Sequence, residues 1–523
     1  MLLDKEIHDK SLRYLEILII LGASLFPLLI NLPYRVNIFL TWEGAYRMYL
    51  GQLPFKDFGM PLGYGFFVLP YLFFKIFGPY LYTLVITQAV INIATLFAFS
   101  NLLRRLGLSQ PLRLLSVFVF ILSHTFQNFW PWYNQSVFVF QLIGFNFLVI
   151  GIQTASLKRS IINVIISSFF IFWAFFTKQD SGAIAIVFGG LLLAYHSWIS
   201  KKYTLVAVYI GSLLLIGSVV IVPLLSYNFG YWFNLGQAPH NSRLKLIDFL
   251  NKIIGGSNWE KFYIGVILLI FIKKAERFKE YINQEKDVLF FLIAIGVVLQ
   301  SLVIKITSPL PTDHHSYFHA FAFAYGISFT VSVVDWHKFR FILPGLFLVF
   351  LWWSALYWDY FSRIFAVPPS KPQEAVAEVA PLSPWNVSPY RAFRKIKMPQ
   401  STIDGIAYIK ELDIVKTKKD LKVLNMSEIT PLAHELNYTP MTDQPLWYHL
   451  DIGMFMQQVN DFCQKMDRKE YDLILYQDIP VLPTFYPQEL KPCLNKSYKL
   501  IKKFEAPRKR TEGDSYIFVY IRQ

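Results

Sequence analysis

The chain alternates long apolar stretches with short polar connectors, and this pattern constrains its fold more than any other feature. A helix that spans a bilayer needs roughly 17–25 mostly apolar residues. Charged residues make up only 16% of the chain, whereas a soluble globular chain usually has roughly 25%. The sequence therefore predicts a polytopic α-helical membrane protein. About eleven stretches qualify as spanning helices, near residues 13–33, 81–103, 112–128, 134–153, 160–177, 182–199, 203–226, 259–273, 287–307, 316–334 and 339–361.

A further apolar stretch, residues 62–78, is short and carries Pro70 and Lys75. The charged connectors decide its placement, because Lys and Arg concentrate in cytoplasmic loops. If 62–78 lies along the membrane surface, all the basic connectors fall on the side of the N-terminus. We therefore expect a juxtamembrane helix there, with its apolar side in the membrane interface. The basic connectors are 104–107, 157–160, 200–202, 273–286 and 337–340.

This topology gives a cytoplasmic N-terminus and a C-terminal domain on the outer side of the membrane. In a bacterium these are the inner membrane and the periplasm. The same topology places several polar stretches on the outer face, where ionisable side chains cost less than at mid-bilayer. These stretches are 34–80, 129–133, 178–181, 227–258 and 308–315.

The C-terminal part has the composition of a water-soluble domain. Residues 362–384 are rich in Pro and Ala and predict a linker between a membrane part, 1–361, and a soluble part, 385–523. Two amphipathic stretches, 402–412 and 451–466, predict helices. We expect a small α/β domain, in which we find no P-loop, dinucleotide fingerprint or zinc-site spacing. Its predicted strands are 420–426, 471–477, 497–504 and 515–522.

The chain has two cysteines, Cys463 and Cys493, and both lie in the soluble part. Outside the cytoplasm they could pair, but spacing alone also allows two ordinary buried thiols. The net charge is +15. We assign it to cytoplasmic loops and a basic tail, because no basic and aromatic nucleic-acid module is visible. The sequence therefore predicts no nucleic-acid partner.

The first outer stretch contains the segment TWEGAYRMYLGQLPFKDFGMPLGYG, residues 41–65, with the acids Glu43 and Asp57 and the bases Arg47 and Lys56. If this segment is helical at its start, Glu43 and Arg47 share a face because they are four residues apart. One interpretation is a surface salt bridge on an amphipathic lid. The other makes one carboxylate a catalytic base and lets the cations hold a phosphate.

A second polar group follows at TKQDSG, residues 177–182, at the outer end of a predicted helix. Lys178 either reaches along the helix to the membrane interface or contacts a phosphate. In the second interpretation Gln179 and Asp180 are its polar partners.

A third group lies in PLPTDHHSYFHAF, residues 309–321. His315 and His319 are four residues apart on the predicted helix, and Asp313 and His314 are next to them. Such a pair of histidines can bind a metal, although the Glu of a protease motif is absent here. Anion binding and ordinary interfacial histidines are the other interpretations, and Asp313 could serve only as a helix N-terminal residue.

The membrane part, 1–361, resembles in its layout the GT-C glycosyltransferases, multispanning enzymes that use polyprenyl-phosphate-linked sugars, such as the protein O-mannosyltransferases and the aminoarabinose transferases. Residues 41–107 carry this resemblance most specifically. The resemblance consists of an anchor helix, a large acidic first outer loop, a PLGY juxtamembrane helix ending in FKIFG, and a next helix ending in LLRRLG. The Lys178–Gln179 pair is also similar. One departure concerns the Asp–Glu pair that the family usually has at the start of this loop, because here the pair is Trp42–Glu43.

The resemblance implies a GT-C-like membrane domain and transfer of a sugar to an acceptor hydroxyl on the outer face. A sugar on a polyprenyl phosphate already has a good leaving group, so catalysis needs phosphate stabilisation and one carboxylate base. Direct displacement would invert the anomeric centre. Glu43 is the first candidate for the base and Asp57 the second. The candidates for the lipid phosphate are Arg47, Lys178, Gln179, Asp313, His314, His315 and His319.

Two other functions remain open at this stage. One is a transporter or flippase for a lipid-linked saccharide, although such proteins tend to have repeated halves and mid-membrane sites. The other is a non-catalytic, GT-C-like assembly subunit. The expected partners are the bilayer, a polyprenyl-phosphate-linked sugar, and a lipid, glycan or protein acceptor. A divalent metal is the one cofactor that the histidines leave open.

Overall fold

The computed structural model describes residues 6–35, 38–125, 128–236, 246–307, 317–354, 357–358, 361, 383–508 and 514–523. Contacts divide the chain into two compact units, which are described separately here. The helical unit comprises Met1–Phe26, Gln88–Pro223 and His240–Tyr360. The mixed unit comprises Pro27–Thr87, Leu224–Pro239 and Phe361–Gln523.

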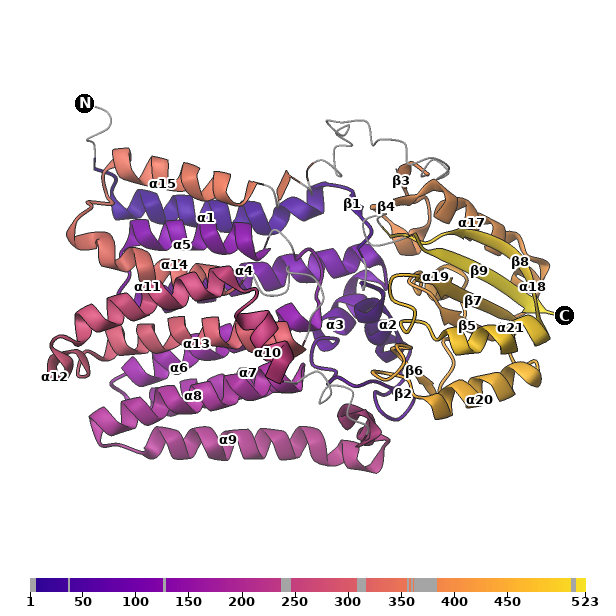
Figure 1. Cartoon of the computed structure of the whole chain (residues 1–523), viewed down its shortest axis with the longest axis horizontal. Helices are drawn as coiled ribbons and strands as arrows, with labels where there is room; N and C mark the ends of the chain where they lie inside the picture. The colour runs from indigo at the N-terminus through magenta and orange to yellow at the C-terminus, as the bar shows by residue number, and fades with distance from the viewer. Residues whose placement is uncertain are drawn as a thin grey trace. The chain divides into compact units, whose positions relative to one another are not determined.

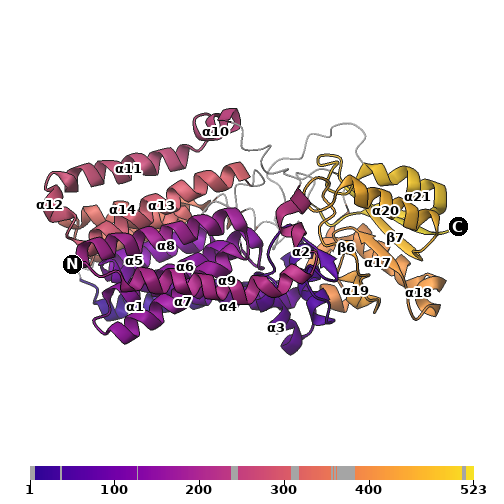
Figure 2. The ribbon, with the colours of Figure 1, turned by 90° about the horizontal axis from the view of Figure 1, so that it is seen from below.

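Each of the eleven predicted spans corresponds to a helix, and these helices run side by side in the helical unit (Figures 1 and 2). Among the described residues, seven helices are long and apolar enough to cross a membrane by length and composition. The predicted helical membrane fold is confirmed. The helices are α1 (Asp9–Leu25), α4 (Leu81–Arg105), α5 (Gln110–Ser123), α6 (Tyr133–Gln153), α7 (Leu157–Phe175), α8 (Gln179–Ser200), α9 (Thr204–Ile221), α11 (Asn258–Ala275), α13 (Glu285–Thr307), α14 (Phe318–Ser328) and α15 (Phe339–Trp352).

Small residues let these helices pack closely, as is common between membrane helices. A Cβ atom at Gly144 of α6 would lie 2.6 Å from the side chain of Ile171 of α7. A larger residue fits there only if the Ile171 side chain moves. Close packing of this kind fixes the positions of neighbouring helices relative to one another.

The predicted juxtamembrane segment forms α3 (Val68–Phe77), which belongs to the mixed unit. Its ten residues extend about 15 Å, half of the roughly 30 Å hydrocarbon core, so the helix is too short to span. Its exposed side chains include Leu72, Ile76 and Phe77. This apolar side fits the predicted position in the membrane interface.

The C-terminal part of the mixed unit contains the predicted α/β domain. Its four-stranded sheet has the order β5-β7-β9-β8, in which β5 and β7 are parallel and β7, β9 and β8 are antiparallel. The four strands lie where the alternating pattern predicts them. They are β5 (Val423–Met426), β7 (Leu473–Asp478), β8 (Tyr498–Glu505) and β9 (Tyr516–Arg522).

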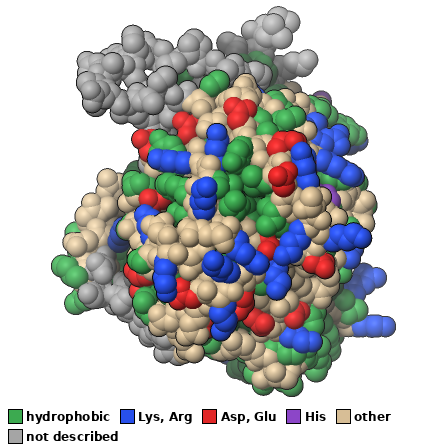
Figure 3. Space-filling model, turned by 90° about the vertical axis from the view of Figure 1, so that its right-hand side faces the viewer, with side chains coloured by type: hydrophobic (Ala, Val, Ile, Leu, Met, Phe, Trp, Pro, Cys, Tyr) green, Lys and Arg blue, Asp and Glu red, His purple; other side chains and the backbone are tan. Residues whose placement is uncertain are grey.

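Helices accompany the sheet, and the two predicted ones are present as α17 (Gln400–Glu411) and α20 (Met456–Asp467). Cys463 of α20 forms a disulfide with Cys493 of α21 (Lys491–Ser497), with 5.4 Å between their Cα atoms. This settles the alternative that the spacing left open. Charged side chains of both signs are spread over the face in Figure 3, as expected for a surface in water.

Short strands join the first outer loop to the C-terminal part. Strand β1 (Leu32–Pro33) pairs in parallel with β4 (Ile396–Pro399), which also pairs with β3 (Trp385–Val387). Strand β2 (Phe58–Gly59) pairs in parallel with β6 (Gln444–Pro445). Residues 32–59 and 385–445 are therefore folded together in the mixed unit. Of the predicted linker, residues 362–382 lie outside the described residues.

Candidate functional site

The first outer loop contains the helix α2 (Ile38–Tyr49). One side of this helix packs against neighbouring segments, and another side carries Glu43 and Arg47. Trp42 lies on the packed side, where it is fully buried, donates a hydrogen bond to the Pro79 carbonyl at 3.0 Å, and stacks on Tyr46. Gly44 lies under the Phe67 ring, and a Cβ there would be 2.5 Å from that ring. Glu43 lies on the other side of the helix, together with Arg47 one turn later.

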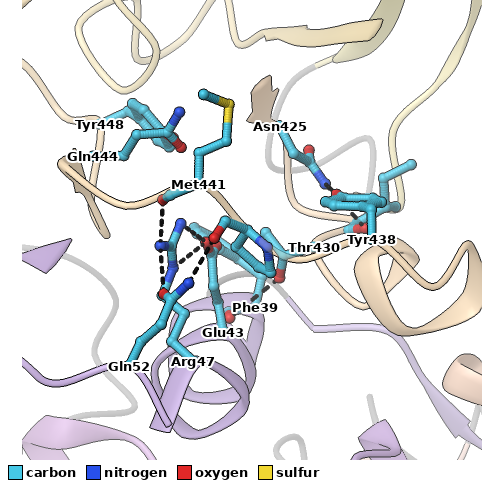
Figure 4. A network of polar contacts seen from close by, with 12 residues as sticks. Phe39, Glu43, Arg47, Gln52, Asn425, Thr430, Tyr438, Met441, Gln444 and Tyr448 are labelled. Atoms are coloured by element: carbon cyan, nitrogen blue, oxygen red, sulfur yellow. Dashed lines mark hydrogen bonds and ion pairs between the residues drawn. The ribbon is translucent and has the colours of Figure 1, made fainter. Parts of the chain in front are cut away.

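Glu43 and Arg47 form a buried ion pair (Figure 4). The Arg47 Nε and Nη2 groups donate to the same oxygen, Glu43 Oε1, at 3.0 and 2.9 Å. Arg47 Nη1 donates to Gln52 Oε1 at 3.1 Å and to the Met441 carbonyl at 2.8 Å. The Gln52 amide donates to the Pro440 carbonyl at 2.7 Å. Four of the five guanidinium donors are therefore occupied, and the bonds to the Met441 and Pro440 carbonyls hold this end of α2 against the loop at residues 440–441.

The ion pair lines a small cavity of the mixed unit. Its space open to water-sized molecules suffices for about one water. Among the described residues, Glu43 Oε2 takes part in no hydrogen bond, so one carboxylate oxygen is anchored and the other is available. The remaining lining residues are Val423, Asn425, Thr430, Ala433, Tyr438, Pro440, Gln444 and Tyr448.

Burial controls the electrostatics of this cavity. It raises the pKa of the Glu43 carboxyl above its usual value of 4.5, and the charge and hydrogen bonds of Arg47 partly offset this rise. Burial also raises the pKa of Tyr448 well above 10.0, and Glu43 adds to that rise. The phenol therefore stays a neutral hydroxyl. The cavity thus combines a carboxylate that is more basic than an exposed one with neutral hydroxyl and amide groups, and it can accept a proton from a hydroxyl.

Asp57 has a different environment from Glu43. Its Oδ2 accepts a hydrogen bond from the Leu53 amide at 2.7 Å, and its own amide donates to the Leu53 carbonyl at 2.9 Å. These bonds close a turn in which Phe55 has a positive φ of 65°. Lys56 projects over the Tyr227 ring, with 5.9 Å from Nζ to the ring centroid. The structure thus places Asp57 as the residue that stabilises the turn before β2.

Lys178 and Gln179 lie in the helical unit, where Lys178 precedes the first turn of α8. The Lys178 side chain is buried, with Nζ 3.3 Å from Asp180 Oδ2 and 5.9 Å from the centroid of the Tyr133 ring. Asp180 also accepts a hydrogen bond from the Ser181 amide at 2.6 Å. Asp180 is thus an acidic partner of Lys178.

His319 lies in α14 of the same unit and is buried among aromatic side chains. Its Nδ1 is 3.2 Å from the Tyr263 hydroxyl, and its ring centroid is 5.5 Å from that of Trp259. Asp313, His314 and His315 lie outside the described residues. Within the part of the chain that the structure describes, no group of three or more His, Cys, Asp and Glu could hold a metal ion.

Sequence reasoning missed most of the cavity wall. Gln52 is polar and close in sequence to Arg47. Its position one residue after Gly51 was the only local indication that it contacts Arg47. Asn425, Thr430, Tyr438, Gln444 and Tyr448 come from a segment about 400 residues away, and no spacing rule links such positions. The ion pair of Glu260 and Lys305, with 2.5 Å between Oε1 and Nζ, was also missed, because both residues lie in apolar stretches that were interpreted only as spans.

Comparisons with models of known protein families and with curated proteins gave no match. Solved structures are similar in fold. ArnT from Cupriavidus metallidurans, bound to undecaprenyl phosphate, matches over 98% of both chains with a TM-score of 0.53 and 12% identity. The Archaeoglobus fulgidus oligosaccharyltransferase, tethered to an acceptor peptide, matches over 94% of this chain and 72% of its own, with a TM-score of 0.50 and 10% identity.

A third similar structure is the arabinofuranosyltransferase AftD from Mycobacteria. It matches over all of this chain and 40% of its own, with a TM-score of 0.50 and 11% identity. These three structures are GT-C glycosyltransferases. The chain has the fold of the GT-C membrane glycosyltransferases.

Proposed function

We propose that the chain is an integral-membrane glycosyltransferase that moves a sugar from a polyprenyl-phosphate donor to an acceptor hydroxyl. The fold supports this proposal, since ArnT was solved with undecaprenyl phosphate and AftD is an arabinofuranosyltransferase. The observation that carries the proposal is the geometry of Glu43. A buried carboxylate with one oxygen fixed by Arg47 and the other without a hydrogen bond among the described residues lines a polar cavity.

In this mechanism Glu43 Oε2 accepts the proton of the acceptor hydroxyl as its oxygen attacks the anomeric carbon. The bond from that carbon to the phosphate oxygen breaks, and polyprenyl phosphate leaves with the electron pair. Because the raised pKa makes Glu43 a stronger base than an exposed carboxylate, proton transfer is favoured near neutral pH. Among the described residues that line the cavity, Glu43 is the one carboxylate, which supports a single displacement with inversion.

We assign Arg47 a positioning role in place of the phosphate contact that the sequence suggested. Four of its donors are occupied by Glu43, Gln52 and the Met441 carbonyl. It fixes the orientation of the carboxylate and holds the loop at residues 440–441 over the cavity. This loop must move for a sugar to enter, because the present space admits about one water.

Contacts to the donor phosphate remain assigned to residues of the helical unit. Lys178 supplies a buried cation beside Gln179, and His319 supplies an imidazole at the start of α14. The same role for Asp313, His314 and His315 rests on the sequence alone.

We further propose that the protein lies in a bacterial inner membrane with its N-terminus in the cytoplasm and its C-terminal domain in the periplasm. The basic connectors support this orientation. The disulfide between Cys463 and Cys493 supports it independently, because disulfides persist in the periplasm and are rare in the cytosol.

The proposal is tested with the full chain in lipid nanodiscs and a panel of undecaprenyl-phosphate-linked sugars. We expect release of undecaprenyl phosphate from one donor when an extract of envelope glycans is added as acceptor, and little release by Glu43→Gln. Movement of intact lipid-linked sugar across a vesicle membrane without release would instead identify a transporter. A chain that neither releases nor moves any of these donors would refute the proposal for this donor class.

A further inference from the structure

We propose that Lys305, whose ammonium lies beside Glu260 and Ser257, is a further binding residue for the phosphate of the lipid donor. This inference rests on the proposed function. Lys305 lies in the last turn of α13 and Glu260 in the first turn of α11. Helices α11, α13 and α14 pack against one another (Figure 2).

The contacts of Lys305 leave part of its ammonium group available. Nζ lies 2.5 Å from Glu260 Oε1 and 3.4 Å from Ser257 Oγ. An ammonium has three donors, so among the described residues one of them has no acceptor. The Lys305 side chain is 24% exposed, whereas that of Glu260 is fully buried. The Lys305 side chain is therefore nearer to the surface than the Glu260 carboxylate.

The ion pair of Glu260 and Lys305 lacks the hydrogen bonds expected of a pair that only stabilises the fold. A buried ion pair stabilises only when further hydrogen bonds satisfy both partners. Glu260 is completely buried, and within the described part of the chain neither of its carboxylate oxygens takes a hydrogen bond, so Oε1 meets Lys305 as an ion pair only. A charge in an apolar helix is costly to retain and usually marks a ligand or ion site. These points favour a ligand for Lys305 over a pair that only joins α11 to α13.

The surroundings fit the headgroup region of a lipid. Trp259 is partly exposed beside Glu260, and its ring centroid is 5.3 Å from that of Trp352. Tryptophans concentrate at the depth of lipid headgroups. Farther along α11, Phe262 and Leu269 are exposed and apolar. A polyprenyl chain could therefore lie along α11 while its phosphate reaches Lys305.

The C-terminal part of α13 also contacts α8, the helix that begins directly after Lys178. The Gln300 amide of α13 donates to the Ser181 carbonyl in the first turn of α8 at 3.1 Å. The end of α13 and the start of α8 are therefore at the same end of the helical unit. Lys305 and Lys178 therefore lie at the same end of this unit, each beside one carboxylate.

The test measures binding of undecaprenyl phosphate to the full chain in nanodiscs, with undecaprenol as the neutral control lipid. We expect Lys305→Gln to weaken undecaprenyl phosphate binding by about tenfold or more and to leave undecaprenol binding unchanged. Lys305→Arg should stay within about threefold of wild type, because it keeps the charge. Glu260→Gln should tighten phosphate binding several-fold, since it removes a negative charge beside the ammonium.

The double variant Lys305→Gln/Glu260→Gln controls for misfolding, because it removes both charges and leaves no buried carboxylate unpaired. It should fold and should still bind undecaprenyl phosphate weakly. Wild-type phosphate affinity in this folded double variant would overturn the role of Lys305. If that happens while Glu43→Gln still abolishes transfer, the proposed function survives and only this inference fails. Equal wild-type affinity for undecaprenyl phosphate and undecaprenol would instead refute both.

Discussion

Replacement of Glu43 by Gln should abolish sugar transfer while leaving the protein folded. Gln is nearly the same size as Glu and keeps an amide oxygen where Oε1 accepts the two hydrogen bonds from Arg47. It cannot accept a proton at neutral pH. The substitution therefore separates the chemistry of the carboxylate from its packing.

The structure sets the size of both effects. Hydrogen bonds to a charged group contribute about 1.5–3 kcal/mol and neutral ones about 0.5–1.5 kcal/mol, so weakening two of them should cost up to about 3 kcal/mol of stability. Arg47 is only 1% exposed, which puts the cost toward the upper end. Loss of a general base should slow transfer by about 10²–10⁴-fold. A modest loss of stability in a folded protein cannot produce such a decrease.

The assay follows release of undecaprenyl phosphate at saturating donor, with thermal unfolding measured on the same preparations. Gln52→Ala is the matched control, because it removes one hydrogen bond to Arg47 and one to the Pro440 carbonyl but keeps the carboxylate. We expect this control to lose a comparable amount of stability and to retain its rate within about threefold. If Glu43→Gln retains a third or more of the wild-type rate, or if both variants slow equally, Glu43 is not the base.

Three further predictions concern the mixed unit: the pH dependence set by Glu43, the role of Asp57, and the disulfide. The transfer rate should fall as the pH falls through the pKa of Glu43, at a higher pH than for an exposed Glu because burial raises that pKa above 4.5; a rate that stays flat down to pH values near 4.5 would contradict this. Asp57→Asn should keep the rate within about threefold and lose at most about 1 kcal/mol of stability in thermal unfolding, since the amide oxygen can still accept from Leu53; a loss as large as that of Glu43→Gln would move the base to Asp57. Replacing Cys463 and Cys493 by Ser should lower stability by about 3–4 kcal/mol, because the disulfide closes a loop with a sequence separation of 30; unchanged unfolding of the variant, or of the wild type with reductant, would show that the bond does not form.

The pattern of apolar stretches was sufficient to predict the helical unit, because a bilayer permits few structures other than spanning helices. The four long strands of the C-terminal sheet were also predictable, since alternation over several residues is a strong signal. Strands β1 and β2 could not be predicted, because two residues are too few to show an alternating pattern. Their partners are more than 350 residues away, which no local pattern reveals.

The site shows the same division between local and distant information. The helical spacing of Glu43 and Arg47 predicted their contact, and the structure shows it. The role of Trp42 could not be predicted, because its packing partner at Pro79 belongs to a later segment. That side of α2 is buried, so an acidic residue at position 42 would face the packed side and not the cavity. Glu260 and Lys305 were missed because hydropathy averages over single charges in an apolar run.

The pairing of β2 with β6 also determines when the first outer loop can complete its fold during synthesis of the chain. Phe58 and Gly59 leave the ribosome long before Gln444 and Pro445, by roughly 20–80 s at a synthesis rate of ~5–20 residues per second. During that interval the segment with Glu43 and Arg47 lacks the carbonyls of Pro440 and Met441 that will bind Gln52 and Arg47. The cavity beside Glu43 therefore forms only after residues 423–448 have been made, so under the proposed function a shorter nascent chain in the membrane has no competent site.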